Sequence, residues 1–265
     1  MFSVVIPLYN KEKSVKKTIE SVLNQTFQDY EVIVVNDGST DNSLEVVKSF
    51  NDERIRIINQ KNSGVSSARN RGIKEAKYEW MAFLDADDLW ENNHLQVVDE
   101  MIKSYPNEKV FCTSFATCKN NMHHQKNNSI IIVEDYFKEV LNGYVICSSV
   151  AVIHQSVFKN IGHFNEILSR GEDLDMWARI GKYYRIIKSN MVTALYVQDS
   201  ENRLTKYETN INKYITNYIN FAVLTGYEKK YYQKLVVDNI KSEIINKNIK
   251  TSVKLLWKYN IKLII

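Results

Sequence analysis

The sequence predicts an α/β fold built on a mostly parallel, doubly wound sheet. Two observations support this prediction: apolar runs of strand length alternate with segments whose apolar residues recur at helical spacing, and a polar loop follows each strand. The strand-like runs of the N-terminal half are 2–6, 31–36, 54–59 and 80–84. Because ligands of such sheets bind outside the carboxyl ends of the strands, we expect the polar residues that follow these strands to form the site.

The first predicted unit is a strand, a loop and a helix. Phe2–Ile6 forms the strand, and Pro7 is expected to end it because proline has no N–H to donate to a continuing ladder. Ser14 is expected to cap the helix that follows. The apolar stripe of this helix consists of Val15, Ile19, Val22 and Leu23.

The second unit repeats this pattern. Glu31–Asn36 is a strand that is buried on both faces, and it leads into an acidic loop. In that loop Gly38 allows a tight turn, and Thr40 or Asp41 can cap the next helix. The apolar stripe of that helix is Leu44, Val47 and Phe50.

The third unit consists of a strand over 54–59 and a helix over 64–76. Polar loops after four strands therefore carry candidate functional residues. These residues are Asn10, Asp37, Asn62 and Asp85. Parallel strands bring such loops to one edge of the sheet, which favours a binding site there.

The apolar run Trp80–Leu84 ends in the carboxylates Asp85, Asp87 and Asp88. In an extended chain Asp85 and Asp87 leave the strand on the same side, and a hard divalent ion between them would relieve their repulsion. This pattern favours a metal and phosphate site. The alternative is that Asp87 and Asp88 only cap the next helix, which is expected over 95–104.

Four motifs in one order resemble the family 2 glycosyltransferases with the GT-A fold. They are Val4-Val5-Ile6-Pro7-Leu8-Tyr9-Asn10, Val34-Val35-Asn36-Asp37-Gly38-Ser39-Thr40-Asp41, Asn62-Ser63-Gly64 with Ala68-Arg69-Asn70-Arg71-Gly72, and Asp85-Ala86-Asp87. The resemblance covers about the first 200 residues of the chain. Asn36 departs from the family, which often has Asp there, but it leaves Asp37 in register.

The resemblance implies a UDP-sugar donor that lies across the edge of the sheet. The residues implied to bind its nucleotide are Pro7, Tyr9, Asp37, Arg69 and Asp85. Asp87, with Asp85 beside it, would bind the Mn²⁺ or Mg²⁺ that bridges the diphosphate. In related chains an Arg and a His often follow a strand like 186–197, and here Arg203 is expected to supply that positive charge.

The acceptor side carries a second match to the family. The segment 170–177 contains Glu172 and Asp173, and the resemblance implies that Asp173 is the catalytic base. Asp173 is expected in the first turn of a helix, where the helix dipole favours an ionised carboxylate. Glu172 and Trp177 are candidate acceptor residues, although Trp177 suits core packing equally well. The alternative for Glu172 and Asp173 is that they only balance the helix dipole.

The mechanism that the resemblance implies is a single inverting displacement in which an acceptor hydroxyl attacks the anomeric carbon and UDP leaves. An α-linked donor would give a β-linked hexosyl or N-acetylhexosaminyl product. The Gln-x-x-Arg-Trp element of processive synthases is absent from the sequence, so one sugar is expected to be transferred per binding event. The resemblance also implies a role in the synthesis of a cell-surface polysaccharide or a lipid-linked oligosaccharide.

Composition excludes several other classes of protein. The 265 residues include 44% hydrophobic residues but only eight glycines and two prolines, so the chain is globular rather than disordered or fibrous. Three cysteines with no paired spacing suit a reducing cytosol. We expect neither a secretory signal nor a membrane span, and therefore a cytoplasmic protein, either free or peripheral on the inner face of the membrane.

We expect a glycosyltransferase domain over 1–205, with a nucleotide-binding half over 1–105 and an acceptor-binding half over 106–205. Residues 206–265 form a basic helical extension with 11 lysines and 4 acidic residues, in a chain whose net charge is only +4. Its segment 249–265 carries lysines at every fourth position. It could bind an anionic membrane surface, or it could pack on its own domain or on a second subunit.

Two other function classes remain as alternatives. A nucleotidyltransferase acting on a sugar phosphate would also use an α/β fold and a carboxylate-held metal, but it predicts a glycine-rich loop after the first strand. The loop here contains no glycine. The basic, aromatic stretch 227–234 is compatible with nucleic-acid binding, but it matches no recognised module, so no nucleic-acid partner is expected.

Overall fold

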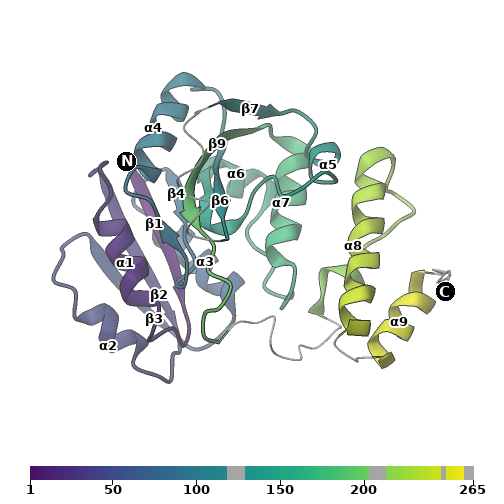
Figure 1. Cartoon of the computed structure of the whole chain (residues 1–265), viewed down its shortest axis with the longest axis horizontal. Helices are drawn as coiled ribbons and strands as arrows, with labels where there is room; N and C mark the ends of the chain where they lie inside the picture. Colours follow the sequence, from purple (N-terminus) through teal and green to yellow (C-terminus); the bar gives the residue numbers. More distant parts are fainter. Residues whose placement is uncertain (118–128, 203–212, 246–248, 260–265) are drawn as a thin grey trace.

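The computed structural model describes residues 1–117, 129–202, 213–245 and 249–259, and Figure 1 shows how their elements are arranged. The N-terminal part contains β1 (Phe2–Leu8), α1 (Val15–Leu23), β2 (Tyr30–Asp37), α2 (Ser43–Lys48), β3 (Ile55–Gln60), α3 (Val65–Glu75), β4 (Trp80–Phe83), β5 (Leu89–Trp90) and α4 (His94–Ser104). It is followed by β6 (Val110–Ala116), β7 (Ile130–Val133), α5 (Tyr136–Glu139), η2 (Ser148–Val150), β8 (Ala151–His154), α6 (Gln155–Ile161), α7 (Glu172–Tyr183), β9 (Ile186–Leu195), η5 (Ile215–Asn217), α8 (Gly226–Ile245) and α9 (Ile249–Tyr259). The predicted α/β class is confirmed.

One mixed sheet forms the centre of the molecule. Within the described residues its strands follow the order β3-β2-β1-β4-β8-β6-β9-β5, and β7 pairs with β9. β3, β2, β1 and β4 are parallel neighbours, whereas β8 is antiparallel to both β4 and β6. Leu8 of β1 lies opposite Asn36, and Val5 lies opposite Phe83. The loops after β1, β2 and β4 therefore meet at one edge of the sheet.

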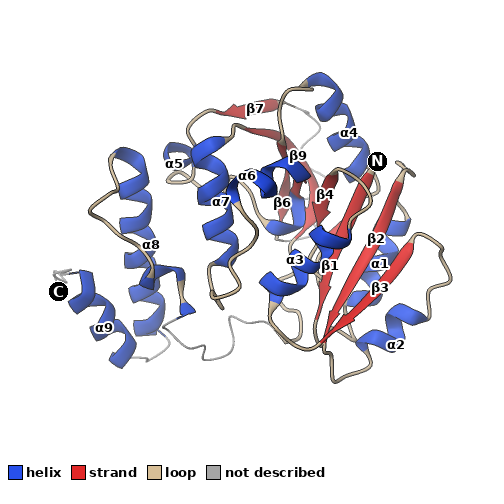
Figure 2. Cartoon of the chain, turned by 180° about the vertical axis from the view of Figure 1, so that it is seen from behind, coloured by secondary structure: helices blue, strands red, loops and turns tan. Residues whose placement is uncertain are grey.

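Helices cover the parallel strands on both faces. Alternate residues of a strand point to opposite faces, so Val32 and Val34 of β2 join the main core with α1, whereas Ile33 and Val35 pack with Ala68 of α3. Figures 1 and 2 show α1 and α3 on opposite sides of the sheet. This arrangement explains why the second strand is an unbroken apolar run.

The first strand continues through Pro7, contrary to the prediction that Pro7 ends it. The carbonyl of Val5 accepts a hydrogen bond from the backbone N of Leu84, so odd-numbered residues of β1 direct their backbone groups toward β4. β4 pairs with β1 only as far as Val5. Pro7 therefore lies beyond the end of this ladder, where a missing N–H breaks no strand hydrogen bond.

The alternative in which Asp87 and Asp88 only cap the next helix is wrong. The short strand β5 follows them and pairs with β9, and α4 begins at His94 with Asn93 as its N-cap. The helix itself ends at Ser104, as predicted. The two carboxylates are therefore available for other contacts.

The second half of the chain is less regular than predicted. The small and branched residues of 145–154 predict a strand, but only the last four residues form one, because a turn of 3-10 helix, η2, precedes β8. The sequence also predicts a helix over 134–141, of which only the short helix α5 forms. β7 and α6 were not predicted at all. Two further expectations lie outside the described residues: Arg203 as a source of positive charge and the domain boundary at 205.

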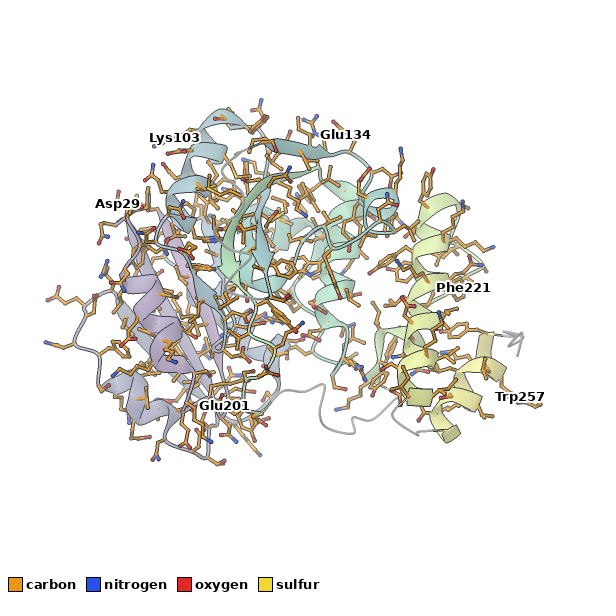
Figure 3. All side chains as sticks on the ribbon, in the orientation of Figure 1. Asp29, Lys103, Glu134, Glu201, Phe221 and Trp257 are labelled. Atoms are coloured by element: carbon orange, nitrogen blue, oxygen red, sulfur yellow. The ribbon has the colours of Figure 1, made fainter. Side chains whose placement is uncertain are left out.

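Helix α8 packs against the second half of the domain, and α9 packs against α8. Tyr231 of α8 contacts Tyr136 and Phe137 of α5, with ring centroids 6.0 Å and 5.6 Å apart. Arg170 Nη1 lies 3.5 Å from Glu243 Oε1 of α8. The exposed indole of Trp257 projects from α9 at the far side of the molecule (Figure 3). Of the helices in the described ranges, none combines the length and the apolar character that a bilayer span requires.

Candidate active site

The loops after β1 and β2 are bound to each other at the carboxyl edge of the sheet. Asn10 has a left-handed backbone with φ of 51°, and its Oδ1 accepts a hydrogen bond from Thr40 N at 2.8 Å. The backbone N of Lys11 donates to Ser43 Oγ at 2.7 Å. Asparagine tolerates the left-handed conformation better than other non-glycine residues. These contacts fix the course of the loop that carries Tyr9 and Lys11.

Asp37 is buried, and its carboxylate organises the loop that leads into α3. Its Oδ1 accepts hydrogen bonds from Gln60 Nε2 at 2.8 Å and from Ser63 N at 2.9 Å, and its Oδ2 accepts one from Gly64 N at 2.8 Å. Gly38 is required next to it, because a Cβ there would lie 2.8 Å from Asn62 N. In this structure the carboxylate of Asp37 therefore holds the loop before α3 against the end of β2.

Pro7 and Tyr9 lie near Asp37 along the same edge. Pro7 is half-buried, and the ring of Tyr9 is 38% exposed. Asn202 donates a hydrogen bond from Nδ2 to the carbonyl of Tyr9 at 3.2 Å. An exposed aromatic ring beside buried polar groups suits contact with a flat, partly polar ligand such as a nucleobase.

Arg69 connects the two halves of the candidate site. It projects from α3, is 3% exposed, and donates from Nη2 to Asp85 Oδ1 at 2.8 Å and from Nη1 to Glu172 Oε1 at 3.2 Å. Its guanidinium carbon also lies 5.3 Å from the centre of the Phe164 ring. Burial by itself would lower the pKa of Arg69, but the carboxylates of Asp85 and Glu172 outweigh it and raise that pKa. Arg69 therefore remains charged.

Asp173 lies in the first turn of α7, next to Glu172. Its Oδ1 accepts a hydrogen bond from the backbone N of Leu174 at 2.8 Å, and the residue remains partly exposed. Loss of solvation and repulsion from Glu172 raise the pKa of Asp173 to about 7, while Arg69 opposes this shift. A carboxylate with such a pKa can accept a proton near neutral pH.

Asp87 forms an ion pair that the sequence did not suggest. Lys11 Nζ lies 2.7 Å from Asp87 Oδ2 and 2.5 Å from the carbonyl oxygen of Glu201, and the hydroxyl of Ser200 also donates to Asp87 Oδ2. The Glu201 carboxylate accepts hydrogen bonds from the backbone of Lys13 and Ser14 at the start of α1. Figure 3 labels Glu201, whose carboxylate thus lies at the start of α1. The segment after β9 is thereby held against the predicted metal site.

Asp88 does not face the site. It is buried, its Oδ2 accepts a hydrogen bond from the Ser149 hydroxyl, and its Oδ1 accepts one from Val197 N at 2.9 Å. Burial, with repulsion from Asp85 and Asp87, raises the pKa of Asp88 well above its ordinary value. Asp88 thus connects the end of β4 to the chain that follows β9.

The chemistry of Asp85 and Asp87 fits a hard divalent cation. One oxygen of each carboxylate, Asp85 Oδ2 and Asp87 Oδ1, accepts no hydrogen bond from the described residues. The described part of the chain contains no cluster of three or more His, Cys, Asp or Glu side chains that could hold a metal ion. Mg²⁺ and Mn²⁺ are commonly held by one or two carboxylates and completed by phosphate and water oxygens, which suits this small donor set.

Two sequence-based expectations need correction or refinement. Trp177 is 1% exposed and packs edge-on against Phe164, so this structure places its indole in the core, which is the alternative that the sequence also allowed. Arg69, expected next to the nucleotide, binds two protein carboxylates, one of which, Asp85, is itself an expected nucleotide-binding residue. Sequence reasoning also missed Lys11, Ser200 and Glu201. A lysine directly after the site residue Asn10 was the available signal for the first of these.

Comparison with known proteins gives consistent results. The model of the family Glycosyl transferase family 2 matches residues 3–162. An uncharacterized glycosyltransferase of Rickettsia bellii is 33% identical over 226 residues, which cover 83% of this chain and 31% of that protein. One from Rickettsia typhi is 31% identical over 225 residues, which cover 78% of this chain and 69% of its own length.

Solved structures show the same fold. S. aureus TarS 1-349 in complex with UDP-GlcNAc matches with a TM-score of 0.65 and 23% identity over 78% of this chain and 61% of that one. Another TarS structure matches with a TM-score of 0.63 and 24% identity over 74% of this chain. The present chain spans about a third of that TarS chain, and about a third of the Rickettsia bellii protein.

Proposed function

The chain belongs to glycosyltransferase family 2, and on that premise we propose that it transfers one sugar from a UDP-sugar to an acceptor hydroxyl, with inversion at the anomeric carbon. The transferred group is a hexosyl or N-acetylhexosaminyl unit. The UDP-GlcNAc and UDP complexes of TarS, whose fold this chain shares, support a uridine diphosphate donor.

The observation that carries the proposal is the Arg69 bridge. It joins Asp85, at the end of β4 where the nucleotide would bind, to Glu172, the neighbour of the proposed base. A donor on one side and an acceptor on the other side of this bridge would meet next to Asp173. Holding two reactants in a fixed relative position is a large part of the rate enhancement of any transferase.

On the donor side, Tyr9 and Pro7 would contact the nucleobase, while Asp37 keeps the loop before α3 in place. Asp87 and the free oxygen of Asp85 would hold Mn²⁺ or Mg²⁺ at the diphosphate. A cation bound there would stabilise the negative charge that develops on the leaving UDP. Asp85, which Arg69 holds in position, is also close to the proposed ribose position.

On the acceptor side, Asp173 would take the proton from the acceptor hydroxyl as that oxygen forms its bond to the anomeric carbon. The bond from that carbon to the diphosphate oxygen breaks on the opposite face, so an α-linked donor gives a β-linked product. The pKa of about 7 for Asp173 suits a general base at neutral pH. Glu172 would position this carboxylate through its contact with Arg69.

The acceptor would be a growing cell-surface polysaccharide or a lipid-linked oligosaccharide. An Escherichia coli chondroitin synthase, 30% identical over 69% of this chain, supports a saccharide acceptor. The exposed Trp257 and the basic character of the C-terminal extension support peripheral contact with an anionic membrane on which such an acceptor would lie.

A binding measurement followed by a transfer assay tests this proposal. UDP at 100 times the dissociation constant that it has with Mn²⁺ should stabilise the protein by about 2.7 kcal/mol in thermal unfolding. The same UDP concentration without Mn²⁺ should stabilise it less, and GDP and CDP should have little effect. Asp87→Ala should lose the Mn²⁺-dependent part. Asp173→Asn should keep the UDP response but lose about 10²- to 10⁴-fold in transfer rate when UDP-sugars are screened.

Three results would contradict parts of this proposal. No response to any nucleotide would contradict a nucleotide-sugar donor. A UDP response with full transfer activity in Asp173→Asn would leave the donor site in place and remove Asp173 as the base. Product anomers can be read by NMR, and an α-linked product from an α-linked donor would contradict inversion.

A further inference from the structure

The ion pair between Lys11 and Asp87 lies at the proposed metal site, and this inference rests on the proposed function. The Lys11 side chain is 12% exposed and that of Asp87 15% exposed, so water screens the pair only weakly. Asp87 Oδ2 accepts hydrogen bonds from both Lys11 Nζ and the hydroxyl of Ser200. A metal ion that approaches Asp87 therefore meets a carboxylate that already has a counter-ion.

The Lys11 ammonium can move although its backbone cannot. The backbone N of Lys11 is fixed by Ser43 Oγ, and its carbonyl accepts hydrogen bonds from Ser14 N and Val15 N at the start of α1. Four rotatable bonds separate the ammonium from this fixed point. Besides Asp87, the ammonium contacts only a neutral oxygen, the carbonyl of Glu201, among its hydrogen-bond partners in the described residues.

We propose that Lys11 is a resident counter-ion of Asp87 that opposes binding of a divalent cation until a nucleoside diphosphate provides the ammonium with a new anionic partner. Two positive charges on one carboxylate repel each other, so the cation alone binds poorly. The diphosphate can pair with the displaced ammonium and also supply oxygen ligands to the cation. Cation and nucleotide then bind as a coupled pair, and the coupling is reciprocal.

The charge of Lys11, not its bulk, is the quantity to change. Lys11→Met keeps an unbranched stem that packs in the same space without the charge, whereas Lys11→Arg keeps the charge. Lys13→Met is the matched control, because Lys13 lies two residues away in the same loop, has an exposed side chain, and contacts Glu201 only through its backbone N. Asp87→Asn removes the carboxylate.

The experiment is a titration with Mn²⁺ in which the electron paramagnetic resonance signal of free Mn²⁺ is measured, without nucleotide and with saturating UDP. In wild type and Lys13→Met, UDP should tighten Mn²⁺ binding by roughly tenfold or more, within the range of measured couplings. In Lys11→Met, Mn²⁺ without UDP should bind roughly tenfold more tightly than in wild type, and UDP should tighten Mn²⁺ binding by a clearly smaller factor than in wild type, because only the ligands that the diphosphate supplies still couple the two. Lys11→Arg should behave as wild type does.

Several results would overturn the proposal. Equal Mn²⁺ affinity of wild type and Lys11→Met without UDP would show that Lys11 does not oppose the cation. Absence of Mn²⁺ binding in all variants, with UDP still bound, would overturn it as well but leave the UDP donor of the proposed function standing. Absence of UDP binding would remove both. If Lys11→Met does not fold, as judged by thermal unfolding, Lys11→Gln provides the same comparison.

Discussion

At the scale of single residues, the site depends on charges that are held in place by other charges. Arg69 is buried between Asp85 and Glu172, and removal of one partner of a buried ion pair is far more costly than the pair is worth. Asp173 sits beside this network without an ion pair of its own among the described residues. Its protonation is therefore controlled by its neighbours.

The first prediction concerns the pH dependence of transfer. Because the pKa of Asp173 is raised to about 7 and the base must be ionised, kcat/KM should fall about tenfold per unit as pH decreases below 7, and level off above about 8. The same pKa shift of Asp173 also makes the free energy of unfolding depend on pH. A raised carboxyl pKa costs stability in the ionised form, so the contribution of Asp173 to the free energy of unfolding should decrease as pH rises from about 4 to about 7.

Steady-state transfer rates between pH 5 and 9 check this prediction. Binding of the intact UDP-sugar to Asp173→Asn over the same pH range serves as the control and should change little, because its diphosphate has no terminal ionisation at about pH 6. A kcat/KM profile that is flat down to pH 5 would show that the base has an ordinary carboxyl pKa. In Asp173→Asn the predicted change in unfolding free energy between pH 4 and 7 should be smaller than in wild type.

At the scale of elements, close packing of α3 on the sheet positions Arg69. Gly72 lies in the interior of α3, and a Cβ added there would come within 2.2 Å of Val5 Cγ1 of β1. Glycine is a poor helix former, so its presence in the helix is explained by this close approach. The helix can carry Arg69 to Asp85 only while its backbone lies this near to β1.

We therefore predict that Gly72→Ala destabilises the protein by about 1–3 kcal/mol, although alanine is the better helix former. Urea unfolding should show a lower midpoint. The control is Lys74→Ala on the exposed side of the same helix, which should change stability by less than about 0.5 kcal/mol. A higher midpoint for Gly72→Ala would mean that α3 can move away from β1 at little cost.

At the scale of the whole molecule, the C-terminal extension is joined to the domain rather than separate from it. Tyr231 of α8 belongs to the main hydrophobic core, while Val236, Ile240 and Leu255 form a small core between α8 and α9. The C-terminal extension therefore shares the main core through Tyr231 in addition to having a small cluster of its own. The outer side of α9 bears Trp257, which is 85% exposed, and Val253 one turn before it.

We predict that this outer side of α9 binds anionic membranes. In a sedimentation assay at low salt, vesicles of phosphatidylcholine and phosphatidylglycerol should retain the wild-type protein in the pellet. This retention, measured as the pelleted fraction, should decrease as salt screens the lysines. Trp257→Ala should reduce it, whereas Tyr144→Ala, which removes another exposed aromatic ring, should not. Equal retention of both variants, or no retention of wild type, would contradict a membrane role for α9.

The sequence alone determined the sheet edge that carries the site. Asp37 is the last residue of the buried parallel strand β2, and Asp85 comes two residues after β4 ends, so local patterns of apolar residues are enough to place these strand ends. The four motifs added the family and the GT-A type of fold, both of which the comparisons confirm. The same local patterns failed where chain contacts override them, as at Pro7 and in η2.

Only the tertiary structure decided which of these residues touch. Lys11 and Asp87 are 76 residues apart in the chain, and Arg69 and Glu172 are 103 apart. No periodicity links such pairs, because their contact depends on strand order and helix packing across the sheet. Burial of Trp177 is decided in the same way, since Phe164 comes to it from a loop before α7. The sequence therefore supplied the chemical groups of the site, and folding determined how their charges are paired.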